Sequence, residues 1–98
     1  MKPPYYAVIF TSRRTDGDNG YAEAAKHILE LAREQPGFLG FESARQEIGI
    51  SVSYWESLDA IRAWRENAEH RHVQERGAKE WYSEFRVRVC KVEKDYGF

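Results

Sequence analysis

The chain has 98 residues, of which 32% are charged and 42% are hydrophobic, and its formal net charge is −1 at pH 7. A chain of this length and composition is expected to form one globular domain, residues 1–98. Because the positive and negative charges are interspersed, we expect the protein to bind neither nucleic acid nor a membrane surface.

Targeting and membrane signals are not recognised in the sequence. No stretch approaches the roughly 18 apolar residues that a transmembrane helix needs. The segment from Met1 to Phe10 lacks the features of a signal peptide. Cys90 is the single cysteine and cannot form an internal disulfide, which fits a reducing compartment. We therefore expect a cytoplasmic protein.

The first half of the chain predicts a strand, a helix and two further strands. The segment from Tyr5 to Ser12 is rich in aromatic and β-branched residues, which is typical of a strand. After a turn-rich loop, residues 21–34 show the apolar spacing of a helix. Residues 38–45 and 48–55 are expected to pair as a hairpin, because only a short turn separates them.

The second half predicts a helical region and a final strand. Ser57 is a natural N-cap, and the helix after it is expected to end near His70. The residues expected on the inner face of this helix are Leu58, Ile61, Trp64 or Arg65, and Ala68. Residues 71–82 are expected to be helical as well, and residues 85–93 alternate like a strand. The order β-α-β-β-α-β predicts an α+β, ferredoxin-like domain, with helices on one face of an antiparallel sheet.

Alternation along the last two strands assigns side chains to the two faces of the sheet. We expect the apolar set to meet the helices, and this set is Ile48, Ile50, Val52, Tyr54, Phe85, Val87 and Val89. The set expected on the helix-free face is Ser51, Ser53, Trp55, Arg86 and Arg88.

The first strand indicates that the helix-free face is covered too. Residues 5–10 are hydrophobic on both faces of this strand, a pattern typical of strands that are buried on both sides. The chain is too short to cover the second face by itself. We therefore expect a homodimer whose two sheets enclose a cavity with polar and aromatic walls.

Three stretches of the chain resemble the antibiotic biosynthesis monooxygenase (ABM) family. They are Gln35-Pro36-Gly37-Phe38-Leu39-Gly40-Phe41-Glu42, then Tyr54-Trp55-Glu56-Ser57-Leu58, then Trp64 with Ala68-Glu69-His70. The resemblance covers nearly the whole chain and implies a dimeric α/β barrel. Known members include cofactor-free oxygenases of polyketide aromatics, haem-degrading monooxygenases, isomerases and proteins without an assigned activity. Membership therefore implies the architecture more strongly than the reaction.

His70 and Arg88 are the candidate catalytic residues. At the end of the predicted helix, the negative end of the helix dipole would raise the basicity of His70, so that it could accept a proton or polarise a phenol. The alternative is that His70 only satisfies the last carbonyl groups of the helix. Arg86 and Arg88 could hold a carboxylate or an oxyanion, or could pair with Glu42 or Glu47 across the sheet.

The candidate substrate-binding residues combine the helix-free face with one helix residue. They are Trp55, Trp64, Ser51, Ser53 and Arg86. The resemblance implies that Trp64 is the pocket tryptophan of the family, and both tryptophans could stack on an aromatic ring. The alternative is that both anchor the core. His70 and His72 lack a third ligand nearby in the sequence, so we expect no metal site.

Three functions are compatible with the sequence. The first is a cofactor-independent monooxygenase acting on a small aromatic or polycyclic substrate. The second is a dimer that binds a small aromatic or hydrophobic ligand without turning it over. The third, ranked last, is a haem-binding or haem-degrading protein. The haem-degrading branch has its ligand histidine where this chain has Gln74, and it carries an asparagine that the segment from Tyr5 to Ser12 lacks. We therefore expect no cofactor.

Overall fold

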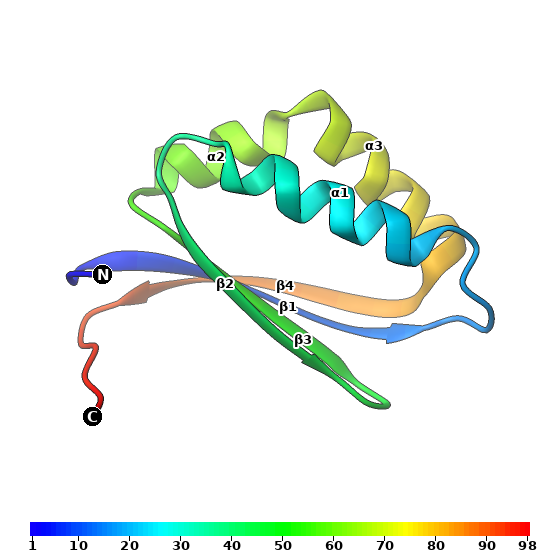
Figure 1. Cartoon of the computed structure of the whole chain (residues 1–98), viewed down its shortest axis with the longest axis horizontal. Coiled ribbons are helices and arrows are strands. Elements are labelled where there is room, and N and C mark those ends of the chain that lie inside the picture. Colours follow the sequence, from blue (N-terminus) through cyan, green and yellow to red (C-terminus); the bar gives the residue numbers. More distant parts are fainter.

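The computed structural model describes residues 1–67 and 69–98 of the chain. Its elements are β1 (Tyr5–Arg14), α1 (Tyr21–Arg33), β2 (Phe38–Arg45), β3 (Gly49–Trp55), α2 (Leu58–Glu66), α3 (Ala68–Arg76), the π-helical turn η1 (Gly77–Trp81) and β4 (Tyr82–Val92). The strands form one antiparallel sheet in the order β2-β3-β1-β4, and the helices lie on one side of it (Figure 1). The predicted α+β, ferredoxin-like β-α-β-β-α-β architecture is therefore confirmed.

The second helical region is divided into α2 and α3 at Asn67. Ser57 caps α2 as predicted, because its Oγ accepts the backbone N–H of Ala60 at 3.0 Å. The Oδ1 atom of Asn67 then accepts the N–H groups of Glu69 and His70, at 3.1 and 3.2 Å, and so caps α3. His70 therefore lies in the first turn of α3. The prediction that it ends a helix was wrong.

The inner face of α2 forms the helix side of the core. Ile61 and Trp64 are buried as predicted, whereas Leu58 is 50% exposed. Ala68 was also predicted on this face and lies outside the described residues. The core cluster consists of Ala32, Trp55, Ile61 and Trp64, with Tyr6, Val8, Ile28, Leu31, Phe38 and Ala60 packed against it. Within the described residues, no helix is long and apolar enough to cross a membrane.

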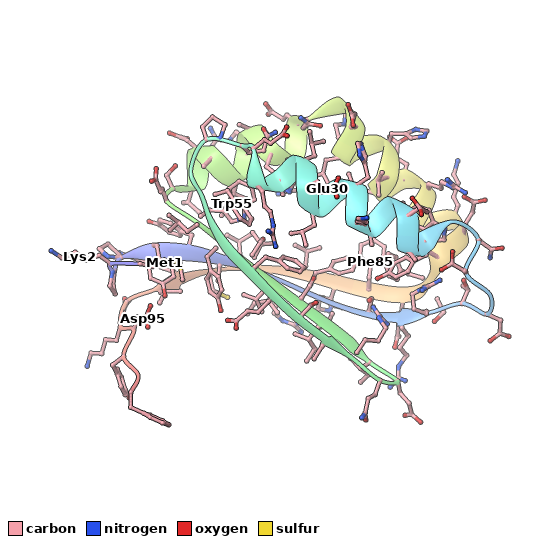
Figure 2. All side chains as sticks on the ribbon, viewed as in Figure 1. Met1, Lys2, Glu30, Trp55, Phe85 and Asp95 are labelled. Carbon is pink, nitrogen blue, oxygen red and sulfur yellow. The ribbon has the colours of Figure 1, made fainter. Side chains whose placement is uncertain are left out.

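The face of β3 that meets the helices is the reverse of the predicted one. Directly paired residues of antiparallel strands share a face. Trp55 pairs with Tyr6 of β1, belongs to the core cluster, and lies between the sheet and the helices in Figure 2. Because side chains alternate along a strand, Ser51 and Ser53 share this side. The helix-free side of β3 carries Ile50, Val52 and Tyr54.

The size and the polar atom of Trp55 explain this reversal. An indole ring offers the helix layer more apolar surface than isoleucine or valine does. Its Nε1–H group donates to Ser53 Oγ at 2.9 Å, so no polar atom of this buried ring is left without a partner. The serines are therefore part of the covered face, although their polarity pointed to an exposed one.

Strand β4 follows the prediction. Its helix-facing residues Phe85 and Val87 pair with Ser12 and Phe10 of β1. Arg86 and Arg88 alternate with them and therefore lie on the helix-free side.

Part of the helix-free face is open and apolar. Ile9 and Val52 lie at its centre, and Ile48 and Ile50 are each 47% exposed. The tail after β4 turns toward this side of the sheet, as Figure 1 shows. In this tail the carboxylate of Asp95 accepts a hydrogen bond from the Tyr5 hydroxyl.

Candidate functional site

Four aromatic rings from β2, β3, α2 and α3 form a column between the sheet and the helices. Phe38 lies edge-on to Trp55, with 5.4 Å between the ring centroids. Trp55 and Trp64 stack at 6.0 Å, and Trp64 and His70 stack at 4.1 Å with 12° between their planes. We call these four residues the aromatic column. Trp55 is 0% and Trp64 is 7% exposed, so the two tryptophans form the buried part of the column. His70 is half-buried and forms the accessible end of the column.

The protonation state of His70 follows from its contacts. Its Nδ1 atom lies 3.1 Å from the backbone carbonyl oxygen of Trp64. A carbonyl oxygen only accepts hydrogen bonds, so we assign the ring hydrogen to Nδ1 and the lone pair to Nε2. Burial lowers the pKa of His70 below 6.5; the bond to Trp64 opposes this effect and the Arg65 guanidinium adds to it. His70 is therefore neutral at pH 7, and among the described residues no group hydrogen-bonds to Nε2.

The helix-facing side of β4 is poorly covered by the helices. Phe85, Val87 and Val89 point to that side, yet they are 48%, 41% and 43% exposed. Figure 1 shows the reason: α3 lies farther from the sheet than α1 does. We call these three residues the β4 strip. Exposed apolar side chains that lie together in this way mark binding surfaces for ligands or partners.

A second aromatic group lies at the Phe85 end of the β4 strip. Phe10 lies 5.6 Å from Phe85 and 5.2 Å from Tyr82, and Tyr21 lies edge-on to Tyr82 at 5.8 Å. Burial and the neighbouring Tyr21 hydroxyl raise the pKa of Tyr82 well above its ordinary value of 10.0, although nearby guanidinium groups oppose the rise. The Tyr82 phenol therefore stays protonated.

The two predicted serines lie between these aromatic groups. Ser53 supports the column through its bond to Trp55, and Ser51 is half-buried two positions before it on the same face of β3. Thus Ser51, Ser53, Trp55, Trp64 and His70, predicted as site residues, lie together on the helix side of the sheet.

Comparison with known proteins identifies the family of this fold. The family model described as "Antibiotic biosynthesis monooxygenase" matches residues 4–76. The chain belongs to the ABM family. It is 50% identical over 95 residues to "Uncharacterized protein YqjZ" of Bacillus subtilis (strain 168), which covers 95% of this chain and 83% of that protein.

Solved structures are similar to this chain over most of its length. SnoaB, a cofactor-independent oxygenase from Streptomyces nogalater, matches with a TM-score of 0.77 and 12% identity, over 95% of this chain and 97% of that chain. Protein SO0527 from Shewanella oneidensis matches with a TM-score of 0.80 and 11% identity, over 93% of each chain. At such low identities the likeness establishes the fold alone.

The first ABM-like stretch of the sequence is a packing motif that supports the column. Gly37 has a φ of 85°, and a Cβ atom there would lie 2.6 Å from the Cβ atom of Ala60 in α2. Its carbonyl oxygen accepts the N–H of Glu56 at 2.8 Å. This tight turn connects α1 to β2 and packs against the start of α2, so that Phe38, the first residue of β2, contacts Trp55.

Arg86 and Arg88 do not lie with the other predicted site residues. They point to the helix-free side of the sheet, and the sheet separates them from His70 and Trp55. The predicted surface that combined Ser51, Ser53 and Trp55 with these arginines was therefore wrong, because β3 presents its other face to the helices.

Two residues important for the site were missed in the sequence. Asn67 sets the position of His70, and an asparagine just before a new helical stretch is a recognisable N-cap signal. Tyr82 faces the helices only because a β-bulge lies between the pairs Arg13–Glu84 and Arg14–Tyr82. No local signal in the sequence marks this bulge.

The other histidines lie outside the column. His72 is exposed and borders a shallow depression of about 220 Å³ with Glu66, Arg71 and Glu75. His27 is exposed on α1, and its Nε2 lies 2.7 Å from Glu69 Oε2. Among the described residues, no group of three or more His, Cys, Asp or Glu side chains could hold a metal ion.

Proposed function

We propose that this ABM-family protein is a cofactor-independent monooxygenase that acts on a small aromatic or polycyclic substrate. The observation that carries the proposal is the state of His70: a neutral imidazole, fixed by Trp64, with Nε2 available as a proton acceptor. SnoaB, which has this fold, is described as a cofactor-independent oxygenase, and this supports the reaction class.

In the proposed reaction, an acidic methylene group of the substrate loses a proton to Nε2 of His70. The resulting carbanion reacts with O₂. One oxygen atom becomes the new carbonyl group and the other leaves in water, so that R₂CH₂ and O₂ give R₂CO and H₂O. The substrate supplies all of the electrons, and no external reductant is needed. A half-buried base suits this step, because exclusion of water strengthens electrostatic interactions with the anion.

The β4 strip supports an apolar substrate. Phe85, Val87 and Val89 lie on the same side of the sheet as the column and offer exposed apolar surface for an aromatic ring. Because Arg86 and Arg88 lie on the opposite side, the step at His70 does not use them. Their binding of an oxyanion stays a prediction.

We propose further that the protein acts as a homodimer. The open face with Ile9, Ile48, Ile50 and Val52 is apolar, and a second copy packed sheet to sheet would bury it. In this arrangement Arg86 and Arg88 border the space between the two sheets.

The proposal is tested by measuring oxygen uptake by the protein with each member of a panel of polycyclic phenols and their keto tautomers. For a substrate that is turned over, His70→Ala is expected to lower kcat by roughly 100-fold or more, because a positioned general base contributes at least this much. The matched control is His72→Ala, since His72 is exposed and borders only the depression on the outer surface. Unchanged turnover in His70→Ala would remove His70 from the mechanism.

Two further outcomes assign other functions. Saturable binding of a panel member without oxygen uptake would identify a ligand-binding protein in place of an oxygenase. A haem titration with a Soret shift that is lost in His70→Ala would make Nε2 of His70 an axial ligand. A flat haem titration together with oxygen uptake is the result that we expect.

A further inference from the structure

Arg45 holds its guanidinium group against the helix-facing side of the sheet. From the end of β2, its side chain crosses β3 and reaches β1. There Nη2 donates to Ser12 Oγ at 2.5 Å, and Nη1 donates to the Ser12 carbonyl oxygen at 3.4 Å. Ser12 itself is only 3% exposed. The guanidinium is therefore fixed in one place by a buried partner.

A glycine at position 49 makes room for this side chain. Gly49 lies between Arg45 and Ser12 in the paired strands. A Cβ atom at Gly49 would lie well under 3.0 Å from Cζ and Nη2 of Arg45, a separation that real side chains do not adopt. The requirement is steric, because any larger residue would push the guanidinium off the strand.

The fixed guanidinium keeps donors for another acceptor. Arginine has five N–H donors, and Ser12 uses two of them. Within the part of the chain that the structure describes, no carboxylate lies within 4.0 Å of the Arg45 nitrogens. A planar guanidinium matches the two oxygens of a carboxylate, and a side chain that is already held in place loses less entropy on binding.

Aromatic side chains lie next to this group. Arg45, Gly49, Ser12 and Phe85 form one row across the four strands. Because neighbouring strands are about 4.8 Å apart, the Phe85 backbone lies about one strand spacing beyond Ser12, to which the guanidinium is bonded. Phe85 is 48% exposed and lies between the sheet and the helices in Figure 2. The ring of Tyr82 lies 6.2 Å from that of Phe85 and extends the aromatic surface beside it.

We propose that Arg45, Tyr82 and Phe85 form a binding site for an aromatic carboxylate, with Ser12 and Gly49 as positioning residues. The carboxylate binds the Arg45 guanidinium, and the aromatic ring packs on Phe85 and Tyr82. The site lies on the same side of the sheet as His70. The proposal does not depend on proton transfer by His70. Ligand binding at Arg45 is measured without turnover, so it can be present even if the proposed oxygenase reaction is absent.

Isothermal titration calorimetry with 2-naphthoate tests the site, with 2-naphthamide as an uncharged ligand of the same shape. We expect naphthoate to bind at least 10-fold more tightly than the amide, because charge-assisted hydrogen bonds are lost with the amide. Arg45→Gln should weaken naphthoate binding about 10-fold or more and leave amide binding unchanged. Arg33→Gln, which removes an exposed arginine from α1, is the matched control and should retain wild-type affinity.

Gly49→Ala provides a second and independent variant. It keeps every charge of the protein but displaces the Arg45 guanidinium, so it should also weaken naphthoate binding about 10-fold. Circular dichroism checks that each variant is folded. If Gly49→Ala does not fold, Arg45→Gln still tests the site, because it changes only an exposed side chain. Equal affinity for naphthoate and naphthamide, unchanged affinity in Arg45→Gln, or inorganic phosphate binding as tightly as naphthoate would each overturn the proposal.

Discussion

The behaviour of His70 depends on its neighbours in space. The stacked ring of Trp64 covers one face, the Trp64 carbonyl fixes the tautomer, and partial burial favours the neutral form. The start of α3 acts in the same direction, because the N-terminal end of a helix carries partial positive charge. A helix end with the opposite polarity was expected for His70, so the predicted increase in its basicity does not apply.

The pH dependence of stability provides a test at the scale of this residue. The pKa of His70 in the folded protein is below its ordinary value of 6.5. Between these two values the unfolded chain binds a proton that the folded protein does not, so the free energy of unfolding falls as the pH drops below about 6.5. Well above pH 6.5 His70 is neutral in both the folded and the unfolded protein, so its contribution to the free energy of unfolding no longer changes with pH. Urea unfolding at pH 7.5 and 5.5 should therefore show a smaller loss for His70→Gln than for the wild type. Equal losses would contradict the assignment.

The break between α2 and α3 is the element that positions the candidate base. Asn67 ends α2 with its backbone N–H, which donates to the Trp64 carbonyl, and caps α3 with its side chain, which accepts the N–H of His70 directly. The bulge in β4 acts similarly on Tyr82. Counting alternate residues back from Phe85 would put Tyr82 on the helix-free face, and the additional residue at the bulge turns it to the helix side.

Removal of the α3 cap should affect both stability and the site. Asn67→Ala is expected to lower the free energy of unfolding by about 1 kcal/mol, because two N–H groups lose their acceptor. Asn67→Asp keeps an acceptor at the cap and should stay near the wild-type value. Chemical denaturation of the three proteins checks the expectation. A loss of equal size in both variants would show that the cap bond is not the cause.

At the scale of the whole molecule, the described residues leave two apolar surfaces uncovered. The helix-facing β4 strip is one, and the helix-free face of the sheet is the other. The first adjoins the aromatic column and the Arg45 site, and it suits a small ligand. The second spans the width of the sheet and suits another sheet, which is the basis of the proposed homodimer.

A charge at the centre of the helix-free face should prevent the proposed dimer. Ile50 is 47% exposed in the single chain, so Ile50→Asp should leave the protomer folded. In a dimer the new carboxylate would be buried without a partner, which is strongly unfavourable. Light scattering coupled to size-exclusion chromatography should give a dimer for the wild type and a monomer for Ile50→Asp. The control is Ala22→Asp, on the exposed side of α1. A wild-type monomer, or an Ile50→Asp dimer, would exclude this interface.

The candidate site could be predicted in part from residue type. His70, Trp55 and Trp64 were recognised because they are chemically distinctive and match the ABM stretches, and the structure joins them in one column. Arg45 was not recognised. The position of its guanidinium group depends on the contact with Ser12, 33 positions earlier in the chain, and on the space that Gly49 leaves between them because glycine has no Cβ atom. Such contacts leave no periodic pattern along the sequence.

The sequence by itself determined the order of strands and helices, the antiparallel sheet and the membership of the ABM family, because turn residues and alternation act over a few neighbouring positions. Only the tertiary structure decided which side of β3 meets the helices, where His70 lies in its helix and which residues share its side of the sheet. Alternation separates the two faces of a strand but does not identify the covered one. That choice depends on how Trp55 packs with Trp64 in α2, and therefore on the whole core.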